Sequence, residues 1–263
     1  NKTMKIHKFL SFILIISSAA FVQAQDAETT EARKPGHLNN YRFKQLYQEF
    51  SSPSLYRSAS GAPGPAYYQQ QADYKMDIVL DDENAMLYGT ETITYTNNSP
   101  DVLEYLWVQL DQNVRASDSK TSLIEANGAA PAQQASTFVT SYMGKAFDGG
   151  FKIDFVRDRK GNELKYIINR TMMRIDLPNA MEPGDRYSFD IKWWYNVVDH
   201  TIDRARSGYE VFNDGNKGYV VAQFFPRMAV YSDVEGWQNS QFWGRDEFAL
   251  PFGDYEVNIT VPA

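Results

Sequence analysis

The three histidines of this chain, His7, His37 and His200, are its residues best suited to binding a transition metal. A catalytic zinc site on a helix needs two histidines one turn apart, as in the HExxH pattern, together with a third, carboxylate ligand. His7 lies in an apolar N-terminal segment, His37 lies in a polar segment, and His200 has no histidine partner. The sequence therefore predicts no metal ligands and no catalytic residues in this chain.

Two other kinds of site are also disfavoured. A hydrolase built on a nucleophile elbow needs a G-x-S-x-G turn, and the sequence contains none. Asp81, Asp82 and Glu83 form an acidic run, but it lacks the glycine and the distal glutamate of an EF-hand calcium loop. We interpret this run as a solvated turn.

The aromatic run Trp193, Trp194 and Tyr195 could form a platform that stacks on sugar rings. On a strand, however, neighbouring side chains point to opposite faces of the sheet. Trp193 and Tyr195 would then share one face and Trp194 would lie on the other. We therefore expect this run to pack in the core.

The elements that must position any site are expected to be strands. Apolar residues make up 43% of the 263-residue chain, and aromatic residues make up 14%. Tyr, Phe, Val, Ile and Thr are prominent, and these residue types suit a pleated, half-buried surface. The chain has no cysteine, so its stability must come from its core and not from disulfides.

The first 24 residues are typical of a secretory signal peptide. Lys5 and Lys8 precede an apolar run of 13 residues, 9–21, and small residues follow at a cleavage site. The run is shorter than the ~20 residues that span a bilayer, so we expect secretion or a periplasmic location without membrane attachment. Cleavage moves the net charge from −7 to about −10, which argues against nucleic acid as a partner.

We expect three parts along the chain: a signal peptide over residues 1–24, a connecting region over 25–66, and a β domain over 67–263. The connecting region combines a polar tail, a short amphipathic helix over 41–50 and a Pro/Gly-rich loop. The β domain is expected to be incomplete at its C-terminal end.

Apolar and polar residues alternate from residue 74 onward, and this is the pattern of half-buried strands. In the second strand, Glu91, Ile93 and Tyr95 share one face, and threonines occupy the other. Tight turns between the strands favour a mostly β fold, an antiparallel twisted sandwich or saddle. The expected strands cover residues 74–80, 87–96, 103–110, 151–156, 164–168, 172–177, 187–197, 219–231 and 255–261.

Three segments occur in an order known from one protein family. Residues 74–113 contain the pattern G-x-x-x-I-x-Y-x-N and then a strand that ends in Leu-x-x-Asn. Residues 218–237 (GYVVAQFFPRMAVYSDVEGW) contain an aromatic-proline run, and residues 252–263 form a strand that ends in Val-Pro. Together they resemble the N-terminal β domain of the aminopeptidase N and leukotriene A-four hydrolase family of zinc metallopeptidases, the gluzincins. Residues 54–74 are similar to a bacterial secreted subgroup.

The resemblance implies a non-catalytic domain that caps a peptide-binding cleft. In that family the zinc, the HExxH helix and the G-A-M-E-N substrate loop belong to a catalytic domain that follows the β domain. That domain of the same polypeptide would be the partner of this chain, a peptide would be the substrate, and zinc would be the cofactor of the full-length enzyme. The chain alone is therefore expected to be inactive.

The resemblance also implies a substrate-binding role for Gln223. A polar residue of the family's β domain helps to hold the free amine of the substrate, and Gln223 in the run AQFFP matches it in type. The alternative is a polar strand residue that satisfies neighbouring backbone groups. The chain departs from the family in two places: Phe225 stands where an acid often follows the glutamine, and residues 227–231 replace a common Cys-Asp-Glu-Pro sequence.

Two other functions stay open. One is a free-standing secreted β-sandwich module that binds carbohydrate or a protein partner, with Trp193 and Trp194 as the candidate sugar-binding residues. The other is a relative of the peptidases whose metal site has been lost. The gene sequence beyond codon 263 would discriminate between these functions and the peptidase domain.

Overall fold

The structure is a computed structural model that describes residues 53–121, 147–200, 207–244 and 249–262. The chain divides into two compact units, Asn1–Gly36 and His37–Ala263, and every described residue belongs to the second. The expected signal peptide and the expected helix over 41–50 lie outside the described residues. No helix in the described ranges is long and apolar enough to cross a membrane.

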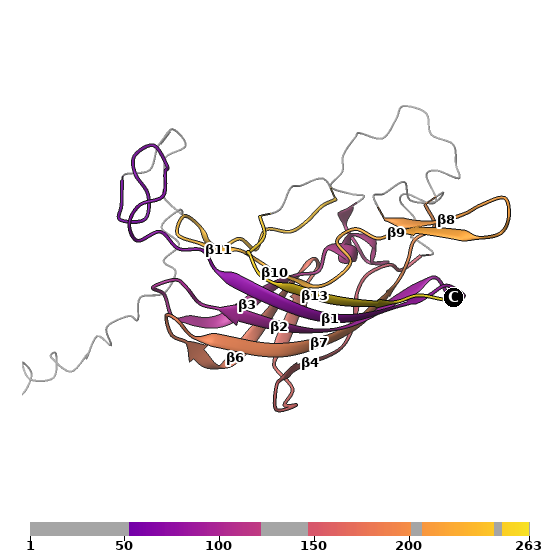
Figure 1. Ribbon diagram of the computed structural model, residues 1–263, viewed down its shortest axis with the longest axis horizontal. Coiled ribbons are helices and arrows are strands. Elements are labelled where there is room, and N and C mark those ends of the chain that lie inside the picture. The colour runs from indigo at the N-terminus through magenta and orange to yellow at the C-terminus, as the bar shows by residue number, and fades with distance from the viewer. Residues whose placement is uncertain (1–52, 122–146, 201–206, 245–248, 263) are drawn as a thin grey trace, which may run out of the picture. The chain divides into compact units, whose positions relative to one another are not determined.

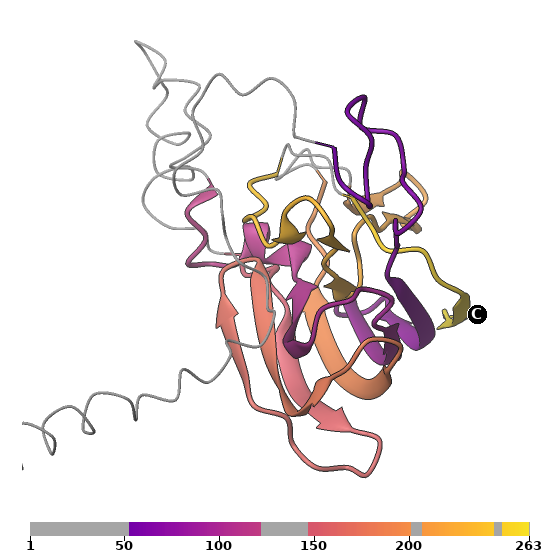
Figure 2. The ribbon, with the colours of Figure 1, turned by 90° about the vertical axis from the view of Figure 1, so that its left-hand side faces the viewer.

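A five-stranded sheet, in the order β13-β1-β2-β7-β4, is the largest sheet among the described residues (Figure 1). In Figure 2, which looks roughly along these strands, β1, β2 and β7 lie side by side and curve together. Its strands are β1 (Gln71–Asp81), β2 (Met86–Thr96), β4 (Lys152–Asp158), β7 (Arg186–Asn196) and β13 (Tyr255–Thr260).

A four-stranded sheet, in the order β10-β3-β6-β5, packs against the larger one. Its strands are β3 (Leu103–Gln109), β5 (Tyr166–Asn169), β6 (Met172–Met181) and β10 (Arg227–Met228). Two small hairpins join β8 (Gly208–Val211) to β9 (Lys217–Val220) and β11 (Tyr231–Ser232) to β12 (Gly236–Trp237). A 3-10 helix, η2 (Asp111–Arg115), follows β3. The expected mostly β architecture is confirmed.

The alternation in the sequence correctly assigned the buried faces of the long strands. Glu91, Ile93 and Tyr95 of β2 are fully buried, whereas the two threonines between them are partly exposed. Gly89 lies opposite Trp193 of β7, and a Cβ atom at Gly89 would lie 2.2 Å from the indole ring. A glycine is therefore needed where the indole of Trp193 crosses β2.

The core lies between the two sheets. One apolar cluster contains Ile93 and Trp193 from the large sheet and Leu106 and Ile175 from the small one, all of them fully buried. Trp193 stacks on Tyr195 with ring centroids 5.9 Å apart, so the expected core packing is confirmed for these two residues, whereas Trp194 is only half-buried. A sugar cannot reach the buried ring of Trp193, so of the two candidate sugar-binding residues only Trp194 has exposed surface.

Two expectations about the C-terminal third were wrong. Residues 219–231 do not form one strand, because β9 ends at Val220 and the chain turns before β10 begins at Arg227. Pro226 lies in the break and cannot donate a backbone hydrogen bond to a sheet. The β13 strand pairs with β1 in parallel, whereas an antiparallel sheet was expected.

Candidate functional site

Gln223 lies in the turn between β9 and β10, not on a strand. Its φ of 54° is in the left-handed region, which a residue other than glycine adopts at a cost of about 1–3 kcal/mol. The side chain is half-buried, and no group among the described residues forms a hydrogen bond with its amide. Two side chains from other segments, Gln112 and Ser207, hold the backbone of this turn.

Gln112 of η2 holds the turn on one side. Its Nε2 donates hydrogen bonds to the carbonyl oxygens of Ala222, at 2.8 Å, and of Gln223, at 3.1 Å. Its Oε1 accepts a hydrogen bond from Nη1 of Arg115 at 2.9 Å. The Gln112 side chain is buried, and while its amide nitrogen bonds the turn, its amide oxygen bonds Arg115 of the same helix.

Ser207, just before β8, holds the same turn on the other side. Its Oγ accepts a hydrogen bond from the Ala222 amide at 2.7 Å and donates one to the Ala222 carbonyl at 3.0 Å. Ser207 is also buried. The peptide groups before Gln223 are therefore clamped between two buried polar side chains.

A buried ion pair lies behind the turn. Nη2 of Arg227 donates to Oδ2 of Asp111, and the two side chains are 9% and 1% exposed. Burial raises the pKa of Asp111 above its ordinary value, and the guanidinium of Arg227 partly offsets that rise. Removal of one partner from such a pair costs about 3–5 kcal/mol, because the other charge is left uncompensated.

The neighbouring residue Asn113 fixes two further segments. Its Nδ2 donates to the carbonyl of Arg170 at 2.6 Å, and its Oδ1 accepts from the amide of Phe151 at 2.8 Å. Three consecutive side chains of η2 therefore each bind a different part of the chain. The short helix acts as the support from which the turn at Gln223 is positioned.

An aromatic group connects this turn to β13. Phe225 packs edge-on against Tyr74, with centroids 5.4 Å apart, and Tyr74 stacks on Tyr255 at 4.9 Å. The hydroxyl of Tyr74 accepts a hydrogen bond from the amide of Met228 at 2.9 Å. The turn that carries Gln223 therefore lies at one end of β13.

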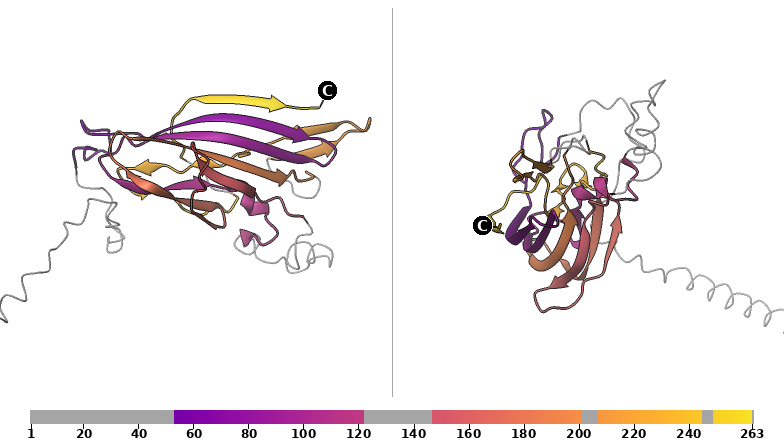
Figure 3. Two further views of the ribbon diagram at one scale, coloured as in Figure 1. Left: turned by 90° about the horizontal axis from the view of Figure 1, so that it is seen from below. Right: turned by 90° about the vertical axis from the view of Figure 1, so that its right-hand side faces the viewer.

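Tyr255, Val257 and Ile259 of β13 form a continuous apolar strip. They pair in register with Tyr74, Met76 and Ile78 of β1, so their side chains share the core face of the sheet. The β1 residues are at most 4% exposed, but the strip residues are 50%, 40% and 61% exposed. Tyr74 and Phe225 contact the ring of Tyr255, but much of the strip stays exposed at the outer edge of the large sheet (Figure 3, left, yellow).

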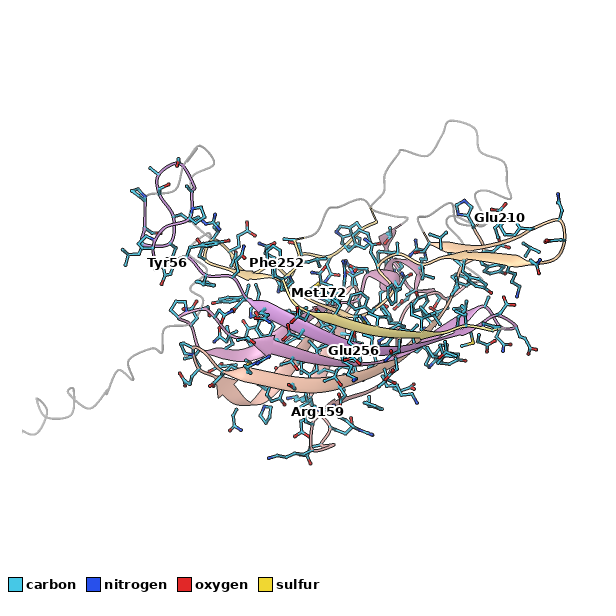
Figure 4. All side chains as sticks on the ribbon, in the orientation of Figure 1. Tyr56, Arg159, Met172, Glu210, Phe252 and Glu256 are labelled. Carbon is cyan, nitrogen blue, oxygen red and sulfur yellow. The ribbon has the colours of Figure 1, made fainter. Side chains whose placement is uncertain are left out.

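The opposite face of β13 is polar and paired. Glu256 forms an ion pair with Lys75 at 2.8 Å, and Asn258 donates to Asp77 at 3.0 Å. Figure 4 shows Glu256 on this strand and Phe252 shortly before it. The strand is therefore amphipathic. Its apolar side lies on the same face of the sheet as the buried residues of β1, but beyond the edge of the core, where it stays exposed.

The β8–β9 hairpin, marked by Glu210 in Figure 4, is anchored on the turn between β1 and β2. The hydroxyl of Tyr219 donates to Oδ1 of Asp82 at 2.8 Å, and Lys217 donates to the Asp82 carbonyl. Asp82 thus belongs to a tertiary contact and does not simply face solvent. His200 and residues of this hairpin together line a hollow of about 280 Å³.

The described residues do not fit a zinc site. No group of three His, Cys, Asp or Glu side chains in the described ranges could hold a metal ion.

Comparison with known proteins gave only structural likeness. No protein-family model and no curated protein matches the sequence. An M1 zinc metallopeptidase from Deinococcus radiodurans, in a mutant bound to a Tyr-Ser-Ala substrate, is similar at 13% identity with a TM-score of 0.36. The match covers 76% of this chain and 34% of that one.

Two related structures give similar values. The M1 zinc metallopeptidase from Deinococcus radiodurans without the mutation is similar at 12% identity and a TM-score of 0.37, over 76% of this chain and 34% of that chain. A two-domain M1 zinc metallopeptidase mutant bound to L-arginine is similar at 13% identity and a TM-score of 0.36, over 74% and 33%. This chain thus spans about a third of the length of these proteins. Likeness at this level does not establish an activity.

Gln223 was the one site residue predicted from the sequence, and its supports were missed. Gln112 and Asp111 occupy the polar end of the third expected strand, in the run LDQN. A strand that ends in three consecutive polar residues is a signal that these side chains bind other segments. The sequence contained no signal for Ser207, which lies in a polar loop with many similar residues.

Proposed function

We propose that this chain is the N-terminal, non-catalytic β domain of a secreted zinc aminopeptidase-like metallopeptidase. In this proposal it covers part of a peptide-binding cleft, and a catalytic domain of the same polypeptide holds the zinc. The observation that carries the proposal is the uncovered apolar strip of β13 with the Gln223 turn at its end. The ordered series of sequence segments described above supports the choice of family.

The strip supports docking of another domain. Burial of a Val, Ile or Tyr-sized apolar side chain stabilises an interface by about 1.5–3 kcal/mol before the entropy costs of docking. Tyr255, Val257 and Ile259 are contiguous, lie on one face and continue an existing core. Exposed apolar surface of this kind, bordered by polar residues, is typical of an interaction site.

The Gln223 side chain suits recognition of a peptide amine. An α-ammonium group offers three hydrogen-bond donors, and the amide oxygen of glutamine accepts such a bond without adding charge. A turn held by Gln112 and Ser207 fixes the origin of that side chain before the substrate binds. Preorganisation of this kind lowers the entropy cost of substrate orientation.

The test compares this chain with the longer polypeptide encoded by its gene. We expect the longer protein to hydrolyse aminoacyl reporters in a chelator-sensitive way and the 263-residue chain to bind zinc only weakly and to hydrolyse none of them. Chelator-sensitive turnover by the chain alone would contradict the proposal. A gene that encodes no HExxH helix after this domain would also contradict it.

Within the longer protein, Gln223→Ala tests the substrate role directly. Loss of a ground-state contact to the amine raises KM, with a smaller effect on kcat. We expect a rise in KM of about tenfold for substrates with a free amine. Unchanged KM would remove Gln223 from the binding site while leaving the docking role of the strip intact.

A further inference from the structure

The left-handed conformation of Gln223 has no local explanation, in contrast to two similar residues. Ala85 and Arg170 also have positive φ angles, of 50° and 54°. Ala85 lies in the turn that joins β1 to β2, and Arg170 lies in the turn that joins β5 to β6. Tight hairpin turns require such angles, but Gln223 lies in no hairpin. Its conformation must therefore be imposed by contacts from elsewhere in the chain.

Two side chains bond this turn, but Ser207 bonds only Ala222, whereas Gln112 bonds the carbonyls on both sides of the Gln223 backbone angles. Consecutive carbonyl groups of an extended chain point in opposite directions, so one amide group cannot reach both of them. Nε2 of Gln112 nevertheless reaches the carbonyls of Ala222 and Gln223, which flank the φ and ψ angles of residue 223. This bridge exists only while the chain is turned at Gln223.

We propose that Gln112 is a positioning residue, which keeps Gln223 in the left-handed turn and so directs its side chain toward the substrate. Arg115 orients the Gln112 amide by donating to its oxygen, which leaves the nitrogen for the two carbonyls. The functional half of this proposal rests on the proposed role of Gln223. The structural half concerns only the turn and can be tested in this chain alone.

Two variants of Gln112 separate hydrogen bonding from packing. Gln112→Glu keeps the shape of the side chain and its partner Arg115 but has no N–H group to donate. Gln112→Met keeps the volume and has no polar group at all. The matched control is Gln70→Met, because Gln70 is also buried and hydrogen-bonded, to Asn97 and Asn98, in a different part of the sandwich.

The first measurement is the backbone angle of Gln223 in the isotope-labelled 263-residue chain. The coupling between its amide and α protons, together with its carbon chemical shifts, reports the sign of φ. We expect Gln112→Glu and Gln112→Met to shift these values to those of a negative φ, and Gln70→Met to leave them unchanged. A positive φ retained in either folded Gln112 variant would overturn the proposal.

A further variant covers the case in which substitutions at Gln112 prevent folding. Arg115→Met leaves Gln112 in place but removes the donor that orients its amide. We expect a partial shift of the same couplings toward negative φ. Couplings identical to those of the unmodified chain would count against the proposal.

The second measurement uses the longer polypeptide and a substrate with a free amine. We expect Gln112→Met to raise KM about tenfold with kcat changed less than about twofold, and to add nothing further in a Gln223→Ala background. A lost turn with unchanged KM would overturn the substrate role of Gln223 and leave the positioning of the turn by Gln112 standing. An additive effect in the double variant would show that Gln112 does not act through Gln223, and would overturn the functional half.

Discussion

Strands β1 and β13 lie side by side in register, have the same alternating pattern and yet differ in burial. Met76 of β1 is 1% exposed, whereas its register partner Val257 of β13 is 40% exposed. The small sheet covers the apolar face of β1 but not that of β13. Alternation in a sequence therefore identifies which face of a strand is apolar. Alternation does not identify what covers that face.

The largest effect on the free energy of unfolding should come from truncating a buried side chain of β1. Met76→Ala removes a buried side chain from a packed core, and we expect a loss of about 2–5 kcal/mol in the free energy of unfolding. The matched variant Val257→Ala should change it by less than about 0.5 kcal/mol in the isolated chain. Denaturant unfolding of the 263-residue chain measures both, and equal losses would contradict the uncovered position of β13.

A smaller, pH-dependent effect should come from Glu91, which lies opposite Met76 on the covered face. Both carboxyl oxygens are buried and lack a hydrogen-bond partner of good geometry among the described residues. Burial raises the pKa of Glu91 well above its ordinary value, and the indole N–H of Trp193 only partly offsets this rise. The folded protein therefore keeps this carboxyl protonated at a pH at which the unfolded chain ionises it.

The sign of the pH dependence follows from that difference. The neutral carboxyl makes its full contribution to the free energy of unfolding below the ordinary pKa of about 4.5, and that contribution is lost as the pH rises above this value. We expect Glu91→Gln to raise Tm at pH 8 more than at pH 5, by about 2–4 °C for each kcal/mol gained. The exposed Glu104→Gln serves as the control. An equal gain at both pH values would show that Glu91 ionises in the folded state.

A charge on the strip should have the smallest effect on the stability of the isolated chain. It also tests most directly whether a second domain covers β13. Val257→Lys should change the unfolding free energy of the 263-residue chain by less than about 0.5 kcal/mol and should reduce binding of an apolar dye. In the longer polypeptide the same substitution should separate the two domains, measured as increased protease sensitivity. Resistance equal to that of the unmodified protein would mean that no domain covers the strip.

The sequence predicted most of the sandwich because the relevant signals are local. The faces of β1, β2 and β7 follow from period-two alternation, and the turns follow from runs of Asn, Asp, Gly and Pro. The burial of Glu91 follows from the same alternation, although a carboxyl would not have been expected in the core.

The supports of the candidate site could not be predicted, because they depend on contacts between distant segments. Gln112 and Ala222 are 110 residues apart, and Asp111 and Arg227 are 116 residues apart. The residues around Gln223 carried a strand-like pattern, and the tertiary bonds of Gln112 and Ser207 overrode it. Parallel pairing of β13 with β1 was also missed, since nothing in either strand specifies its partner.

The parallel pairing of β13 with β1 has a consequence for how the protein is made. Tyr74 meets Tyr255, so the first long strand gains its outer neighbour only after more than a hundred and fifty further residues have been synthesised. Until then one edge of the nascent sheet has unpaired backbone groups on β1, and pairings of such long range form slowly. The order of the strands therefore makes this edge of β1 a place where the incomplete chain is open to pairing with other strands.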